Sequence, residues 1–189
     1  MTAALKEWSA VVHALLDGRQ TVLLRKGGIH EKRFALTASV VSRFTAPRFL
    51  FFPTVAHSHA ERVRPEHADL LHAAADDSTD DEVILRAGAK VVAAVEVGRP
   101  ENLHEIESLH IWTAESVQVD RLDFRPKRRL TVLVVQASPL HEPVRLTRTP
   151  DYAGCKSWVP LPVDPEWASP VYADDALAEI AARVRRSVA

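Results

Sequence analysis

The sequence predicts an α+β fold in which a small, partly closed β-barrel is flanked by N- and C-terminal helices. Several short apolar segments rich in β-branched residues are typical of strands, and tight hairpin-turn signals between them are scarce. Amphipathic periodicity at both ends of the chain indicates helices there. A doubly wound sheet is the alternative, but strands and helices do not alternate regularly along the chain, which favours the barrel.

Helical periodicity is strongest at the two ends of the chain. The first helix is supported by Leu5, Trp8 and Leu15, which recur at helical spacing, and by Gly18, which is placed to end it. The predicted helices cover residues 3–17, a segment that opens at Pro65, short parts of 101–119, and residues 173–187.

Strands are expected wherever short apolar runs are bounded by turn residues. Gly88 is expected to join two of them, and Pro139 and Pro143 to flank a connection between two others. The predicted strands are Thr21–Leu24, Phe49–Phe52, Val83–Leu85, Lys90–Val97, Leu130–Ala137, Val144–Thr147 and Lys156–Val159.

The composition fits one folded domain over residues 1–189, with the helix 173–187 appended to it. The chain is 47% hydrophobic, which is ordinary for a globular protein. Its single cysteine, Cys155, excludes an internal disulfide, fits a reducing compartment and is interpreted as a core residue. No apolar run approaches a membrane span, and charges interrupt residues 1–18, so we expect a cytoplasmic protein with no membrane partner.

Charge is unevenly distributed, although the formal net charge is only −1. Residues 25–48 and 121–148 are rich in arginine and lysine, whereas residues 66–82 are acidic. If the two basic stretches meet in space they form a positive face, and otherwise each is a solvated loop. The acidic run Asp76–Asp81 is interpreted as a solvated loop.

The turn after the first strand is the first candidate site. Arg25 and Lys26 are followed by Gly27 and Gly28, so a phosphate can approach the backbone closely while it meets two cations. His30 can then bond a base edge or a neighbouring phosphate. The alternative is an ordinary surface turn, and the residue pattern excludes a P-loop.

Two histidine-containing segments supply further candidates. Thr54 and His57 are candidates for contact with a polar ligand, and His59 lies two positions further on. The alternative, which the pattern favours, is that His57 and His59 are ordinary loop histidines. No third ligand is suitably spaced, so no metal is predicted. His110 and Trp112 can bond and stack a base, but the pattern favours Trp112 as a core anchor at the start of a helix that Thr113 caps.

The last candidates lie toward the C-terminus. Lys156 and Trp158 share one face of a predicted strand, a pair suited to a phosphate and a base. Lys127, in the second basic stretch, is a further candidate for phosphate contact.

Four segments carry a resemblance to a known family. They are LKEWSAVVHALLDGRQTVLLRKGGIHE, FLFFPTVAH, LHIWTAE and YAGCKSWV, in this order along the chain. They resemble an uncharacterised bacterial family, domain of unknown function 1802, over roughly residues 4–160. The resemblance implies no activity, because the family has none assigned.

A more remote similarity links the chain to the ASCH and EVE domains, which are small β-barrels of the PUA-like superfamily. It is carried by Gly18-Arg19-Gln20-Thr21, by Leu23-Leu24-Arg25, and by the phrase from Leu140 to Leu146. It implies a PUA-like barrel that binds RNA or a modified base. Leu23 stands where an ASCH domain has an acid, which argues against an ASCH-type hydrolase.

Together these observations predict a domain that binds nucleic acid or a nucleotide, most simply RNA or single-stranded DNA, without a cofactor. Arg25, Lys26, Lys127 and Lys156 would hold phosphate. His30, Trp112 or Trp158 would meet a base. One alternative is an enzyme acting on a nucleotide or damaged nucleic acid through His57 or His110 with Lys156, and another is an interaction or defence-accessory protein.

Overall fold

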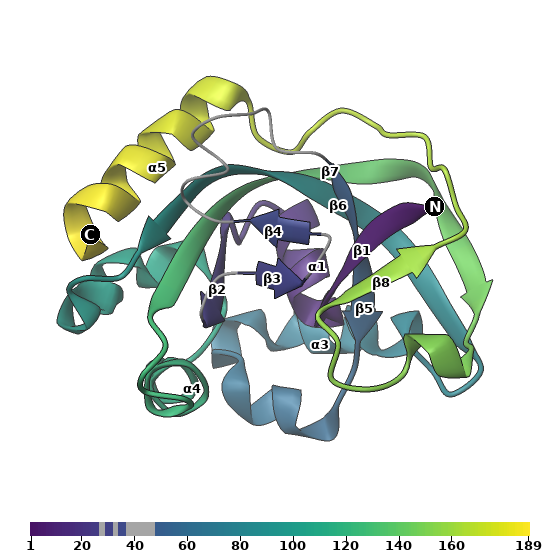
Figure 1. Ribbon diagram of the computed structural model, residues 1–189, viewed down its shortest axis with the longest axis horizontal. Helices are drawn as coiled ribbons and strands as arrows, with labels where there is room; N and C mark the ends of the chain where they lie inside the picture. The colour runs from purple at the N-terminus through teal and green to yellow at the C-terminus, as the bar shows by residue number, and fades with distance from the viewer. Residues whose placement is uncertain (27–28, 32–33, 37–47) are drawn as a thin grey trace.

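A six-stranded sheet forms the centre of the protein (Figure 1). The computed structural model describes residues 1–26, 29–31, 34–36 and 48–189. The strands lie in the order β2 (Val22–Lys26), β7 (Leu130–Thr147), β6 (Glu82–Glu96), β5 (Phe49–Thr54), β1 (Thr2–Trp8) and β8 (Trp158–Leu161). Only β1 and β5 run parallel. The edge strands β2 and β8 do not pair with each other among the described strands, so the predicted α+β fold with a partly closed barrel is confirmed.

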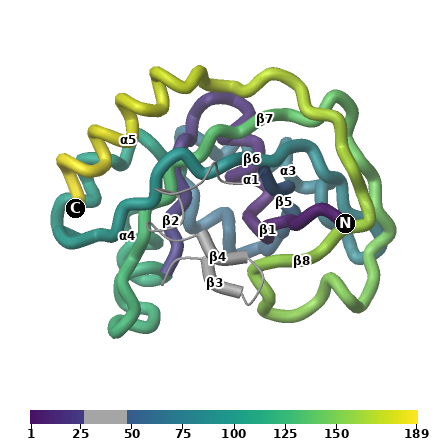
Figure 2. The backbone as a smooth tube through the Cα atoms, turned by 45° about the horizontal axis from the view of Figure 1, so that its top comes forward, coloured from purple at the N-terminus to yellow at the C-terminus, as the bar shows by residue number. Residues whose placement is uncertain are grey.

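Helices cover the sheet and its two ends. In Figures 1 and 2, α5 runs beside one end of the long strands β6 and β7, and the chain termini lie at opposite ends of the molecule. The α-helices are α1 (Ser9–Leu16), α3 (Ala68–Ala74), α4 (Ala114–Val117) and α5 (Asp174–Val188). The 3-10 helices are η1 (His57–Arg62), η2 (Pro65–His67), η3 (Ala75–Asp77), η4 (Pro100–Leu109) and η6 (Pro150–Tyr152), and η5 (Gln118–Asp123) is a π-helix. A separate hairpin pairs β3 (Ile29–Glu31) with β4 (Phe34–Leu36).

The sheet is buried on both faces at strand β5. Phe51 belongs to a large apolar cluster shared with α1 and α5, whereas Leu50 and Phe52 belong to a smaller cluster shared with β8. Neighbouring residues of a strand point to opposite faces. The continuous apolar run in β5 is therefore explained by two-sided burial.

The first predicted helix is wrong in its first half. Residues Thr2–Trp8 form β1, and the helix begins only at Ser9. Leu5 and Trp8 fit a helical period, but β1 is hydrogen-bonded to β5 on one side and β8 on the other, which satisfies its backbone and buries Ala4 and Leu5 completely. Gly18 does follow the end of α1 with a left-handed φ of 75°, as predicted.

Two predicted interruptions are also wrong, because β6 and β7 are each continuous. Gly88 lies inside β6, where a Cβ atom would come within 2.1 Å of the Phe49 carbonyl oxygen and 2.4 Å of the Trp167 ring. Its role is to allow close approach rather than to end a strand. Pro139 and Pro143 lie inside β7 at an irregularity in its register with β6, a position that tolerates the missing N–H groups.

The C-terminal helix contributes to the main core. Leu177, Ala181, Val184 and Val188 of α5 are buried in the larger cluster, and α5 packs on β6, β7 and η4. None of the helices in the described part of the chain is both long and apolar enough to cross a membrane.

Candidate functional site

A cationic cavity of about 340 Å³ lies where the barrel fails to close. Strands β2 and β1 are separated by three other strands in the sheet, yet residues from both line this cavity together with η5. Five cationic side chains face two carboxylates in its lining. The cations are Lys6, Arg25, Lys26, Arg121 and Arg125, and the carboxylates are Glu7 and Asp120.

The two sides of the opening are joined by Glu7 and Arg25. The Arg25 Nη2 atom of β2 lies 2.5 Å from the Glu7 Oε2 atom of β1 and donates to the Lys6 carbonyl oxygen at 2.9 Å. The Glu7 Oε1 atom accepts from the Trp8 backbone N–H, and the Glu7 side chain is only 5% exposed. Some of the Arg25 N–H donors are therefore already bonded within the protein.

Arg121 is a partly buried cation of the cavity that contacts two aromatic rings and donates to the Asp120 carbonyl oxygen at 3.3 Å. Its guanidinium lies 6.0 Å from the Trp8 ring centroid and 5.6 Å from that of Trp112. Burial lowers the pKa of Arg121, but an arginine remains charged at neutral pH. Asp120 is paired instead with Arg62 at 2.6 Å, and no described carboxylate lies within ion-pair distance of Arg121.

An exposed aromatic side chain also lines the cavity. Phe124 lines the cavity with 53% of its surface exposed, and the Arg125 guanidinium lies 4.9 Å from its ring centroid. Val55 and Val119, which are also exposed, each adjoin a lining residue in the sequence. Exposed apolar groups beside clustered cations are suited to a ligand that carries both a flat ring and an anion.

Three residues predicted from the sequence meet in this cavity. They are Arg25, Lys26 and Thr54, whose hydroxyl donates to the Glu7 carbonyl oxygen. The Lys26 Nζ atom donates to the Leu122 carbonyl oxygen at 3.1 Å, and burial lowers the pKa of Lys26. The sequence reasoning missed Arg121, Phe124 and Arg125, although an aromatic between cations in the second basic stretch was a signal for them.

The other predicted polar residues are placed differently. Lys156 is exposed and next to Ser157, which lines the cavity, while Lys127 is exposed beyond η5. His57 is exposed in η1. His30 belongs to β3, and the predicted contacts at Gly27 and Gly28 lie outside the described residues.

The predicted base contacts by Trp112 and Trp158 are corrected by their burial. Trp112 is 2% exposed and Trp158 3% exposed, so neither can present its ring face to a base. Trp158 packs edge-on against Phe49, with 5.3 Å between ring centroids. The interpretation of Cys155 as a core residue is also wrong, since it lies exposed before β8, where no strand pairing covers it.

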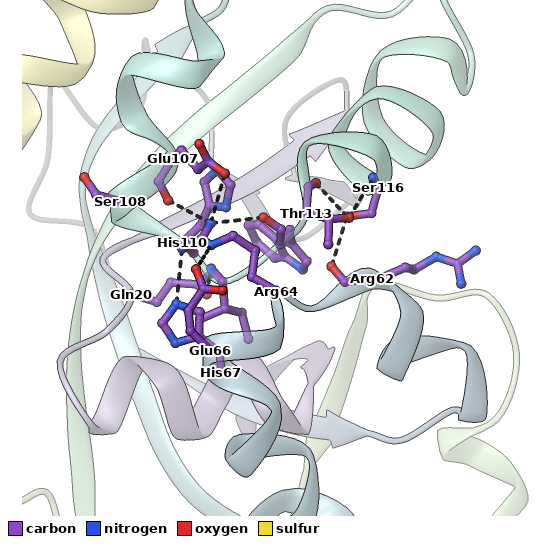
Figure 3. A network of polar contacts seen from close by, with 12 residues as sticks. Gln20, Arg62, Arg64, Glu66, His67, Glu107, Ser108, His110, Thr113 and Ser116 are labelled. Carbon is purple, nitrogen blue, oxygen red and sulfur yellow. Dashed lines mark hydrogen bonds and ion pairs between the residues drawn. The ribbon is translucent and has the colours of Figure 1, made fainter.

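His110 lies in a polar network centred on Arg64 (Figure 3). The Arg64 guanidinium donates to the carbonyl oxygens of Glu107, His110 and Trp112 and to the Glu66 carboxylate. This arrangement fixes the backbone that joins η4 to α4. Burial, with smaller contributions from the charges of Arg64 and His67, lowers the pKa of His110 to about 3, so its ring is neutral at neutral pH.

A second polar cluster surrounds Asp77, which the sequence placed in a solvated loop. Asp77 is only 1% exposed and accepts bonds from Ser9, His13 and Arg86. Ser9 Oγ and His13 Nε2 both bond the carboxylate rather than each other, which is not the order of a nucleophile, base and acid. Among the described residues, no group of three or more His, Cys, Asp or Glu side chains is arranged to hold a metal ion.

The fold and the cavity define a small α+β protein with a cationic hollow at the opening of an incomplete barrel. Residues 4–183 match the family described as domain of unknown function (DUF1802), and the chain belongs to that family. The match confirms the resemblance seen in the sequence and extends it into α5.

The chain is also similar to solved structures of ASCH proteins. ASCH from Zymomonas mobilis is 14% identical, with a TM-score of 0.46 over 84% of this chain and 86% of that one. Two of its mutant proteins are 17% and 15% identical, each with a TM-score of 0.42. They cover 75% and 94% of this chain, and 72% and 95% of their own. No curated protein sequence matches the chain significantly.

Proposed function

We propose that this protein binds the phosphate groups of single-stranded RNA or DNA, or of a nucleotide, in the cationic cavity. The observation that carries the proposal is the imbalance of charge there. Glu7 is paired with Arg25 and Asp120 with Arg62, while Lys26, Arg121 and Arg125 also line the hollow. Cations clustered in a concave, partly desolvated surface attract phosphate more strongly than the same cations spread over a convex one.

Phe124 supports a nucleic-acid ligand over a simple anion. Its ring is exposed at the rim, next to the Arg125 guanidinium. Aromatic side chains beside cations are the usual means by which proteins hold a single strand without reading its sequence, because every base has a face that can stack.

Binding is favoured over the catalytic alternative by where the proposed catalytic residues lie. His110 lines a different cavity, and neither His57 nor Lys156 is among the residues that line the cationic one. The cavity does contain a buried carboxylate, Glu7, but Arg25 and the Trp8 N–H already occupy its two oxygens.

The salt dependence of binding tests the proposal. We expect a fluorescein-labelled oligouridylate to bind in an anisotropy titration, with affinity falling steeply as salt rises. Each phosphate neutralised contributes a log–log slope of about −0.7 on a single strand. Lys26→Gln and Arg125→Gln should each flatten the slope by about that amount.

Arg185→Gln is the matched control, since Arg185 is an exposed arginine of α5 that does not line the cavity. It should leave the slope unchanged. Equal salt slopes in the wild type and the three variants would show that the phosphates bind outside the cavity. Absence of binding to RNA, to DNA and to free nucleotides at low salt would refute the proposal.

Phe124→Ala should weaken binding with little change in salt slope, because stacking releases no counterions. Alanine substitution at a stacking aromatic costs about 1–3 kcal/mol per base, so the loss should be roughly fivefold or more. Val119→Ala, at an equally exposed apolar residue of the same segment, should lose little. The same anisotropy titration measures the affinity of both variants. Equal losses of affinity would exclude stacking of a base on Phe124.

A further inference from the structure

A second cavity, of about 150 Å³, lies between η4 and the α4–η5 segment. Its apolar lining includes Leu103, Val117 and Leu122, and the polar side chains at it include His110 and Gln118. The volume is about five times the space that one water molecule occupies in the liquid. It is therefore of a size for a single flat ring rather than for a whole nucleotide.

His110 gives this cavity a specific polar group. The side chain is 3% exposed, and its Nδ1 atom is buried without a hydrogen-bond partner in the described structure. Buried polar atoms are normally satisfied, so an unsatisfied one at a cavity calls for a ligand or water. The neutral ring offers one N–H donor and one acceptor, and Arg64 holds the His110 carbonyl oxygen at 2.7 Å.

A shallow hollow connects this cavity to the cationic one. It shares Gln118 and Leu122 with the His110 cavity and Lys26 with the cationic cavity, and it adds Arg128. Lys26 and Leu122 are in direct contact, since the Lys26 Nζ atom donates to the Leu122 carbonyl oxygen. Cations therefore continue along the surface from one cavity to the entrance of the other.

We propose that the His110 cavity receives one unstacked nucleobase of a strand whose phosphates occupy the cationic cavity. This inference rests on the proposed function and adds to it a site for base recognition. The backbone would pass Lys26 toward Arg128, while the base inserts among Leu103, Val117 and Leu122. The polar edge of the base would complete the hydrogen bonding of His110.

The test compares two ligands of equal length, an oligouridylate and an abasic oligomer with the same phosphates. Ala114→Phe places a ring at the cavity from an exposed position next to the helix cap, so the fold should tolerate it. We expect it to weaken binding of the oligouridylate about tenfold and to leave the abasic oligomer unaffected. Ala178→Phe, on the exposed surface of α5, is the matched control and should change neither.

A second variant, His110→Phe, keeps the ring and removes both nitrogens. It should weaken only the oligouridylate, while the Tm of the unliganded protein does not fall, because an unsatisfied buried nitrogen is removed. Equal effects on both oligomers, or no effect of Ala114→Phe, would overturn the base pocket while phosphate binding still stands. If the wild type binds neither oligomer, the proposed function and this inference fail together.

Discussion

Replacing Asp77 by asparagine is expected to destabilise the protein by about 3–5 kcal/mol, the usual cost of removing one partner from a buried ion pair. The Asp77 carboxylate is 1% exposed and lies 2.6 Å from His13 Nε2 and 2.8 Å from Arg86 Nε. It also accepts from Ser9 Oγ at 3.1 Å. It therefore ties η3 to α1 and to β6, and its loss leaves the Arg86 guanidinium without a counter-ion.

Denaturant unfolding at neutral pH measures this effect. Asp76→Asn is the control, because Asp76 is the preceding residue in the same acidic run and is exposed. Surface substitutions of this kind usually change stability by less than about 0.5 kcal/mol. Similar values for the two variants would show that the Asp77 cluster contributes nothing beyond surface charge.

The same cluster gives a pH dependence with a definite sign. Burial raises the pKa of Asp77, but the bonds from His13 and Arg86 outweigh it, so the pKa lies below its ordinary value. A carboxyl whose pKa is lower in the folded state stabilises the fold above its unfolded pKa of about 3.9, and the effect is lost as pH falls through the folded pKa. The difference in unfolding free energy between wild type and Asp77→Asn should shrink as the pH falls below the unfolded pKa of about 3.9 and through the folded pKa.

Asp77 also shows what the sequence does not encode locally. In the run Asp76–Asp81 every acid has the same local pattern, and only the position of α1 and Arg86 decides which is buried. The apolar run Leu130–Ala137 and the periodic helix at the C-terminus were predictable, because each is long and its pattern fits one structure. Strand β1 was not predictable in this way, because the strand β5 with which it pairs lies more than forty residues away in the sequence.

The cavity was partly predictable, because some of its residues carry a local sequence signal and others do not. Arg25 and Lys26 end an apolar strand, which is a local signal for an exposed cationic turn. Arg121 and Phe124 meet them only because η5 folds against the end of β2, a contact between segments almost a hundred residues apart. Glu7 was missed because the first segment was assigned to a helix, which hides the strand that carries it into the cavity.

Glu7→Gln is the second variant with a large expected effect, and it links stability to binding. In the unliganded protein, Arg25 would lose its carboxylate partner, and we expect a loss of about 3 kcal/mol in unfolding free energy. The affinity for a labelled oligouridylate should rise by about tenfold at low salt. A unit charge acting across 10 Å at an effective dielectric of 20 is worth about 1.7 kcal/mol, and the variant removes one such repulsion.

Ligand should therefore raise the Tm of Glu7→Gln more than that of the wild type, because tighter binding to the folded state gives a larger shift at equal ligand concentration. Glu115→Gln, which removes an exposed carboxylate outside the cavity lining, should behave like the wild type in both measurements. A Glu7→Gln protein that is less stable and also binds less tightly would contradict the charge argument. In that case the ion pair by which Glu7 positions Arg25 would matter more for binding than the repulsion between Glu7 and phosphate. Arg25 would then be the group that binds the anion.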